Sequence, residues 1–242
     1  MNDKWLRIAP LLLVLVACQG SASQDGDSRK AYGAGDAARD YLTAEPFDRL
    51  VVEIIVAAGV EWDMDRAEVL RRRLEAVCDK PGGIELVAGP FISPEDQRSS
   101  YQVADLRRLQ GRYFGPGSNG RTAGMCVLIL GGELSQGDEA MGFVFAPDGL
   151  ALFQGALRRL APEPDDWPVL EEALLVHEAG HLLGLVGILP HQGHDAADHE
   201  EFRHPFHDRS SRCVMYHLIE RSSTRPPTDF CSHCRADSPS IL

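Results

Sequence analysis

The chain has 242 residues, of which 44% are hydrophobic, and its formal net charge at pH 7 is −12. That hydrophobic fraction is ordinary for a globular protein, and the length is sufficient for one domain with a sizeable core. The negative charge disfavours nucleic acid as a partner, because affinity for a phosphate backbone depends on clustered Lys and Arg.

The N-terminus has the features of an export signal. Two basic residues precede an apolar run at 8–17, which is too short to cross a bilayer, since a spanning helix needs about 20 residues. The run ends in the motif LVAC, which resembles a bacterial lipobox with Cys18 as the residue that receives lipid. We therefore expect residues 1–17 to be a lipoprotein signal peptide and acyl chains on Cys18 to hold the protein at a membrane. An ordinary cleaved signal peptide with a chance cysteine is the alternative.

The residues that follow Cys18 predict a tether and a location in the cell envelope. Gln19 is not acidic, and in lipoproteins of two-membraned bacteria such a residue usually implies sorting to the outer membrane. Residues 18–47 are rich in Gly, Ser, Ala and Asp and poor in large apolar groups, which is typical of a flexible segment. The folded domain is therefore expected at 48–242.

Within this domain, strand patterns and helix patterns alternate. The β-branched run at 50–58 predicts a strand. Residues 63–78 have helical spacing, and Asp63 or Asp65 can cap the start. The elements expected after these are, in chain order, a strand at 84–87, a short helix within 99–111, a Gly-rich loop at 112–122, a strand at 125–130, a hairpin of 142–145 with 150–153, and a helix from about 165 to 183. This order predicts a single α/β domain with a mixed, twisted sheet, one long helix and an irregular C-terminal part that is rich in Cys and His.

The long helix contains the motif HExxH at residues 177–181. Residues four apart share a helix face, so the imidazoles of His177 and His181 can reach one zinc ion. Glu178 lies beside them, where it can take a proton from water that the metal activates. Two helix histidines with an exposed Glu are the alternative. The flanking residues are so apolar that the helix should be buried, however, and titrating groups in a buried helix need partners.

A third ligand has to come from another part of the chain. The longer zinc motif HExxHxxGxxH fits at Gly184, but its last position is Gly187, which cannot bind metal. Histidines and cysteines follow further on. They are His191, His194, His199, His204 and His207, then Cys213 before Val214-Met215, and then Cys231 and Cys234.

This succession resembles the metzincins, and the archaemetzincins most of all. Archaemetzincin sequences run HExxHxxGxxHC, four residues, CxM, a spacer and CxxC. Here His207-Asp208 is followed by four residues, then Cys213-Val214-Met215, and after fifteen residues Cys231 and Cys234. The chain departs from the pattern by an insertion of about twenty residues before the third His, by Asp208 in place of the first cysteine, and by a shorter last spacer. The stretch 177–216 is also similar to predicted bacterial zinc-protease lipoproteins.

The resemblance implies a role for each matching residue. His177, His181 and His207 would be the zinc ligands, and Glu178 the general base. Met215 would be the methionine of the turn beneath the zinc, and Gly184 the glycine at which the chain leaves the helix. His199 and His204 remain alternatives to His207, because the insertion precedes all three. The resemblance also implies that the edge strand at 142–145 aligns the substrate and that residues 216–220 contact it.

A second, structural zinc is implied by the same resemblance, since archaemetzincins hold such an ion on their four matching cysteines. In this chain its ligands would be Cys213, Cys231 and Cys234 with Asp208 as the fourth, or with His233 in place of Asp208. A disulfide among the three cysteines is the alternative, because disulfides are the default outside the cytoplasm. Five cysteines besides Cys18 cannot all pair, so Cys78 and Cys126 would either pair or stay as buried thiols.

Together these features predict a zinc-dependent endopeptidase that hydrolyses peptide bonds in a peptide or protein substrate. One alternative is a non-catalytic zinc-binding surface lipoprotein that acts in adhesion or assembly, but a binding protein has no need for Glu178. The other is a zinc protease of a different class in which Glu200 or Glu201 is the third ligand, and the context of Met215 argues against it.

Overall fold

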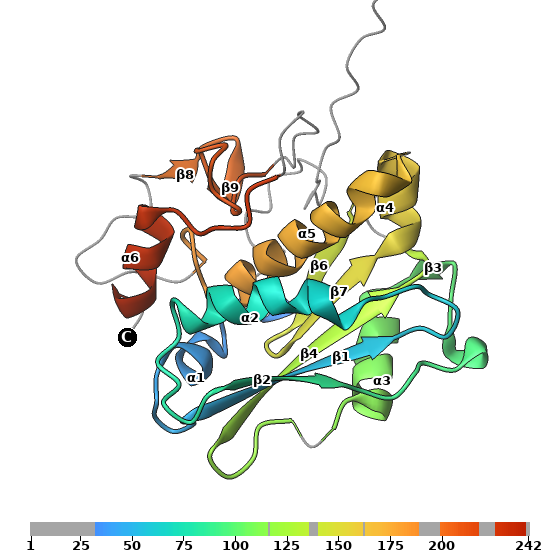
Figure 1. Ribbon diagram of the computed structural model, residues 1–242, viewed down its shortest axis with the longest axis horizontal. Coiled ribbons are helices and arrows are strands. Elements are labelled where there is room, and N and C mark those ends of the chain that lie inside the picture. Colours follow the sequence, from blue (N-terminus) through green and yellow to red (C-terminus); the bar gives the residue numbers. More distant parts are fainter. Residues whose placement is uncertain are drawn as a thin grey trace, which may run out of the picture.

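A five-stranded mixed sheet forms the centre of the protein (Figure 1). The computed structural model describes residues 32–115, 117–135, 140–161, 163–188, 199–217 and 226–240. The strand order is β2-β1-β4-β7-β6, with β6 antiparallel to β7 at one edge and all other neighbours parallel. The strands are β1 (Arg49–Val56), β2 (Ile84–Ala88), β4 (Thr122–Leu130), β6 (Gly142–Ala146) and β7 (Gly149–Phe153). The predicted mixed α/β fold is confirmed, and each strand expected from the sequence is present.

Helices cover the sheet on both faces. Helices α2 (Ala67–Glu75) and α5 (Trp167–Leu182) lie side by side over one face, and α3 (Val103–Tyr113) lies on the other (Figure 1). Helix α5 is buried along most of its length, as its apolar composition predicts. The smaller elements are α1 (Ala38–Leu42), η2 (Met64–Arg66), η3 (Pro94–Asp96), β3 (Ser100–Tyr101), β5 (Glu133–Leu134), α4 (Gln154–Leu160) and η4 (Pro164–Asp166).

The folded domain begins earlier than the sequence predicted. Helix α1 packs into the core, with Ala38 and Tyr41 fully buried, although this segment was expected to be part of the tether. The Tyr41 hydroxyl donates to the Gly124 carbonyl (3.1 Å). The Lys80 ammonium group donates to the Asp40 carbonyl (2.6 Å) and to two further carbonyls of the same segment. These long-range contacts order a stretch whose composition alone looks flexible.

The predicted signal peptide and Cys18 lie outside the described residues. Within the residues that are described, we find no helix with the length and apolar character that crossing a membrane requires.

The C-terminal part packs at the end of α5 (orange to red in Figure 1). It contains the antiparallel pair β8 (Glu200–Glu201) and β9 (His204–Asp208), followed by turns and by α6 (Ser232–Ser240). Helix α5 ends in a turn at Gly184, whose φ of 75° is the left-handed conformation that glycine adopts easily. The chain thus leaves the helix at the glycine that the sequence indicated and returns through the β8–β9 hairpin.

Candidate metal centre

Helix α5 presents three functional side chains from one turn. His177, Glu178 and His181 are all buried. The Nε2 atoms of the two histidines are 3.2 Å apart. Two nitrogens bound to one tetrahedral zinc at about 2.0–2.1 Å would lie roughly 3.3 Å apart, so the observed spacing fits a shared metal ion.

The third imidazole comes from β9. His207 is buried, and its ring centroid lies 5.2 Å from that of His177 and 5.2 Å from that of His181. Each of the three residues offers a donor atom, and these atoms all lie within 4.8 Å of one another. The structure therefore brings together the three histidines that the sequence selected, despite the insertion between Gly184 and His207.

Backbone carbonyls fix the orientation of two of these rings. The Nδ1 of His177 lies 2.7 Å from the Val214 carbonyl oxygen, and the Nδ1 of His207 lies 3.0 Å from that of Pro205. A carbonyl can only accept, so each Nδ1 carries the proton and each Nε2 keeps its lone pair for a metal. Contacts of this kind set the tautomer of ligating histidines.

Glu178 lies between the helix and the edge strand. A β-carbon built on Gly142, the first residue of β6, would be 2.6 Å from Oε1 and 2.7 Å from Cγ of Glu178. The carboxyl group therefore packs directly against the backbone of β6, at the place where only glycine leaves room for it.

Met215 packs against the same helix from another side. A β-carbon on Gly180 would overlap the Met215 sulfur, so the methionine packs against α5 at this glycine. The role of Met215 as the methionine beneath a zinc ion stays a prediction.

The residues that the sequence offered as alternatives to His207 do not join the group of three histidines. His204 stacks on His217 with ring centroids 3.6 Å apart, and His199 belongs to a second cluster. Glu200 accepts a hydrogen bond from the Phe206 backbone (2.6 Å), and Glu201 accepts one from the Arg203 backbone (3.2 Å). His191 and His194 lie outside the described residues.

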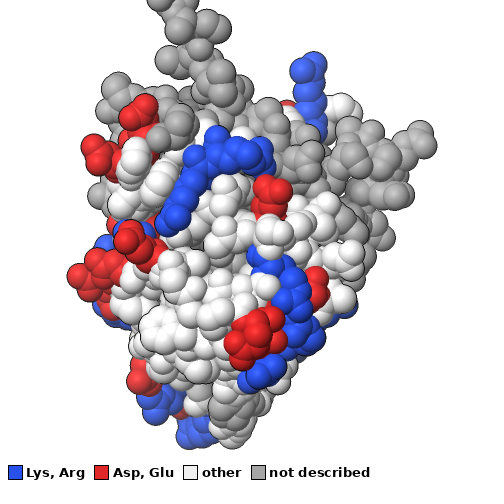
Figure 2. All heavy atoms as spheres, turned by 90° about the vertical axis from the view of Figure 1, so that its right-hand side faces the viewer, with Lys and Arg blue, Asp and Glu red and all other residues white. Residues whose placement is uncertain are grey.

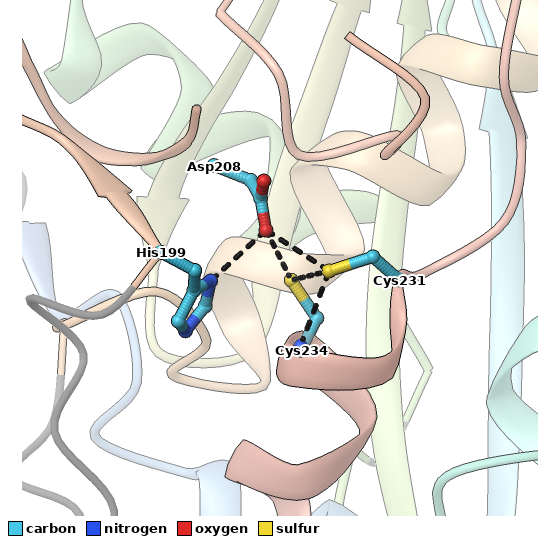
Figure 3. A group of neighbouring side chains, drawn as sticks. All are labelled: His199, Asp208, Cys231 and Cys234. Carbon is cyan, nitrogen blue, oxygen red and sulfur yellow. Dashed lines mark hydrogen bonds and ion pairs between the residues drawn. The ribbon is translucent and has the colours of Figure 1, made fainter. Parts of the chain in front are cut away.

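The second cluster consists of His199, Asp208, Cys231 and Cys234, which Figure 3 shows converging from three separate segments of the chain. Their donor atoms also lie within 4.8 Å of one another. Cys213 adjoins this group, because its sulfur is 3.6 Å from that of Cys234. The predicted donors Asp208, Cys213, Cys231 and Cys234 are therefore brought together. The proposed substitute His233 is exposed on α6 and stacks on His199.

Distances within this cluster resemble those around tetrahedral zinc. Such a site has sulfurs about 3.8 Å apart and a carboxylate oxygen about 3.5 Å from each sulfur. The Cys234 sulfur is 3.6 Å from that of Cys213, 3.7 Å from that of Cys231 and 3.5 Å from Oδ2 of Asp208. Oδ2 is only 3.0 Å from the Cys231 sulfur, a separation that a bound ion would widen.

The described cysteines are all free thiols, including the buried Cys78 and Cys126. Burial raises the pKa of Cys78 to about 12. In the cluster the pKa of Cys231 is lowered, because Cys213 and Cys234 hydrogen-bond to its sulfur. A thiolate at Cys231 is the form that binds metal.

His199 is held between two carboxyl groups. Burial lowers the pKa of this imidazole, but hydrogen bonds to Asp208 and Asp237 outweigh that effect and raise it to about 10. The buried Asp237 had no place in the sequence interpretation.

The structure is similar to archaemetzincin. The matching crystal structure is that of archaemetzincin from Methanopyrus kandleri, with a TM-score of 0.46 and 16% sequence identity, over 79% of this chain and 94% of that chain. No protein-family model and no curated protein matches the chain. At this level of similarity the likeness shows the fold and does not assign a function.

Several residues around the two clusters were not predicted from the sequence. Only Gly180 carries a usable sign, since a glycine inside a helix costs about 1 kcal/mol relative to alanine and its presence points to a close contact. Asp237, Val214 and Gly142 carried no comparable signal.

Proposed function

We propose that the protein is a zinc-dependent endopeptidase. The observation that carries the proposal is the convergence of three buried imidazoles, His177, His181 and His207, with the carboxyl group of Glu178 beside two of them on the same helix turn. Buried polar groups of this kind require partners, and one metal ion would satisfy all three rings.

The donor set fits zinc. Three imidazoles with a neighbouring open position are a common arrangement in catalytic zinc sites, whereas structural sites use four protein ligands. When bound there, zinc would lower the pKa of a water molecule to near 7 and polarise the carbonyl of a substrate.

Glu178 supplies the proton transfers. It lies beside the ligands without belonging to the group of three, so its carboxylate can accept a proton from the attacking water and pass it to the leaving amine. Its packing against Gly142 holds the carboxylate at the edge of the sheet.

The edge strand β6 is the element that would align the substrate. The Phe153 N–H donates to the Met141 carbonyl (2.8 Å), so the pair 141/153 is hydrogen-bonded. Antiparallel pairs alternate, and the N–H and C=O groups of Gly142 and Val144 therefore point away from β7. A peptide that pairs with them by strand addition would run alongside Glu178.

The remaining assignments follow the sequence. Cys18 would carry the lipid, and the substrate would be a peptide or protein of the cell envelope, with the outer membrane as the expected location. Asp208, Cys213, Cys231 and Cys234 would hold a second zinc ion.

The molecular surface carries charges of both signs. On the face shown in Figure 2, basic and acidic side chains lie among uncharged residues.

The test is a comparison of Glu178→Gln with Glu201→Gln in the purified full-length chain. Zinc content should be unchanged in both variants. Peptide hydrolysis should fall by at least about 10²-fold in Glu178→Gln alone, since removing an acid–base group costs about 10²–10⁴-fold. Full activity in Glu178→Gln would remove the assigned role. Loss of zinc and activity in Glu201→Gln would favour the protease class with a Glu ligand. Zinc binding without hydrolysis of any peptide by the unaltered chain would favour the non-catalytic alternative.

A further inference from the structure

The second cluster has an unusual fourth donor. Two of its members are Cys231 and Cys234, the adjoining Cys213 supplies a third sulfur, and the carboxylate of Asp208 lies at the fourth position. Structural zinc sites are normally completed by Cys or His. A carboxylate in this position therefore needs other groups to hold it in place.

Both oxygens of Asp208 are held. Oδ1 accepts a hydrogen bond from the Ser210 backbone N–H (2.7 Å). Oδ2, which faces the sulfurs of Cys231 and Cys234, lies 2.9 Å from Nδ1 of His199. A carboxylate oxygen has two acceptor sites, so Oδ2 can accept from His199 and still bind a metal ion.

His199 is itself fixed on its far side. Its Nε2 lies 3.3 Å from Oδ1 of Asp237, and Oδ2 of Asp237 accepts from the Val186 backbone N–H (3.1 Å). His199, Asp208 and Asp237 are all buried, at 1%, 1% and 0% exposure. A buried chain of hydrogen bonds therefore leads from Val186, in the turn after α5, through Asp237 and His199 to the Asp208 carboxylate that faces the thiols.

We propose that His199 and Asp237 form a clamp that holds Asp208 as the fourth ligand of the second metal ion. Asp208 takes the place of a fourth thiolate, and the clamp keeps it there: Asp237 orients His199, and His199 orients Asp208. His199 and Asp237 are thus positioning residues, and neither one binds the ion. This inference rests on the second zinc of the proposed function and is independent of peptide hydrolysis.

The clamp also connects the two metal centres. Asp208 follows His207 directly in the chain, and Val214, whose carbonyl orients His177, follows Cys213. Val186 belongs to the turn that leaves α5, with a φ of 54°. A metal ion held by Asp208 and Cys213 would therefore fix both the third catalytic histidine and the carbonyl that sets the tautomer of the first.

The experiment measures zinc stoichiometry and affinity, together with the absorption spectrum of the Co²⁺-substituted full-length protein. The variants are His199→Ala, Asp237→Asn, Asp208→Cys and the double variant Asp208→Cys/His199→Ala. The control is His204→Ala, because the His204 ring stacks on His217. The unaltered chain should bind two ions. His199→Ala and Asp237→Asn should weaken binding of the second ion by about 10- to 100-fold, as loss of an outer partner typically does, while His204→Ala should leave it unchanged.

The double variant decides between a clamp and a direct ligand. Four thiolates complete the site in Asp208→Cys, so its Co²⁺ spectrum should gain thiolate charge-transfer intensity, and adding His199→Ala should then cost little affinity. The clamp is overturned if His199→Ala alone leaves the second ion unaffected. It is also overturned if His199→Ala weakens the ion equally in both backgrounds, because His199 would then be a ligand itself. Far-UV circular dichroism of Asp237→Asn, which keeps the shape of the side chain, separates loss of metal from loss of fold.

A single zinc ion in the unaltered chain would overturn this inference while leaving the catalytic site intact. Conversely, Glu178→Gln should lose hydrolysis and still bind the second ion. Failure of the clamp and failure of the proposed peptidase function can therefore be told apart.

Discussion

Replacement of Gly142 by alanine tests how the edge strand holds the general base. The added β-carbon would lie 2.6 Å from Oε1, 2.7 Å from Cγ and 2.9 Å from Cδ of Glu178. Ordinary contacts begin near about 3.4 Å, so the carboxyl group would have to move by about 0.8 Å. A misplacement of about 1 Å in a catalytic group can cost about 10²-fold in rate. We therefore expect kcat to fall about 10- to 100-fold, which is about 1.4–2.8 kcal/mol in the activation barrier.

The assay is steady-state hydrolysis of a peptide, with zinc content and thermal unfolding measured on the same samples. Zinc content should not change, because the three atoms nearest to the added β-carbon all belong to Glu178 and none to a histidine. Gly111→Ala is the matched control: a β-carbon there meets nothing within 4 Å, and the residue lies inside helix α3, so activity should be unchanged. Full kcat in Gly142→Ala would refute the placement of Glu178, and loss of zinc would show that the effect is not confined to the base.

Three further predictions address the ligands, the packing and the anchor. His207→Ala should lose the catalytic zinc while His204→Ala retains it, as measured by metal analysis after dialysis; equal losses would remove His207 from the ligand set. Gly180→Ala should lower the free energy of unfolding by about 1–3 kcal/mol, because the new methyl group would overlap the Met215 sulfur, and an unchanged denaturation midpoint would contradict that packing. Cys18→Ser should release the protein from the membrane fraction, and retention without lipid mass on the mature N-terminus would contradict the lipobox interpretation.

The sheet and the long helix could be predicted because their sequences carry local signals. Strands β1 and β4 are β-branched or apolar runs, and α5 is apolar around most of its circumference. Helix α1 gave no such signal. It has only five residues, and its order depends on contacts with Gly124 and Lys80 that are distant in sequence.

The residues of the two candidate metal sites differ in the same way: some follow from local spacing, and others depend on contacts between distant parts of the chain. HExxH locates His177 and His181 of the first cluster, because helical spacing alone places residues four apart on one face. Spacing could not place His199, since the insertion separates it from α5. The sequence therefore left His199 as an alternative to His207, whereas the structure puts it beside Asp208 and Asp237. The role of Asp237 follows only from the packing of α6 against the turn at Val186, whose backbone N–H donates to the Asp237 carboxylate.

The measurement that tests the central claim most directly is anomalous X-ray scattering at the zinc absorption edge, on crystals of the purified protein. The account predicts a zinc peak about 2.0–2.1 Å from one nitrogen of each of His177, His181 and His207, with Glu178 beside the ion and outside its protein ligands. If protein that has been purified with zinc gives no peak between these three histidines, the zinc-peptidase assignment is contradicted.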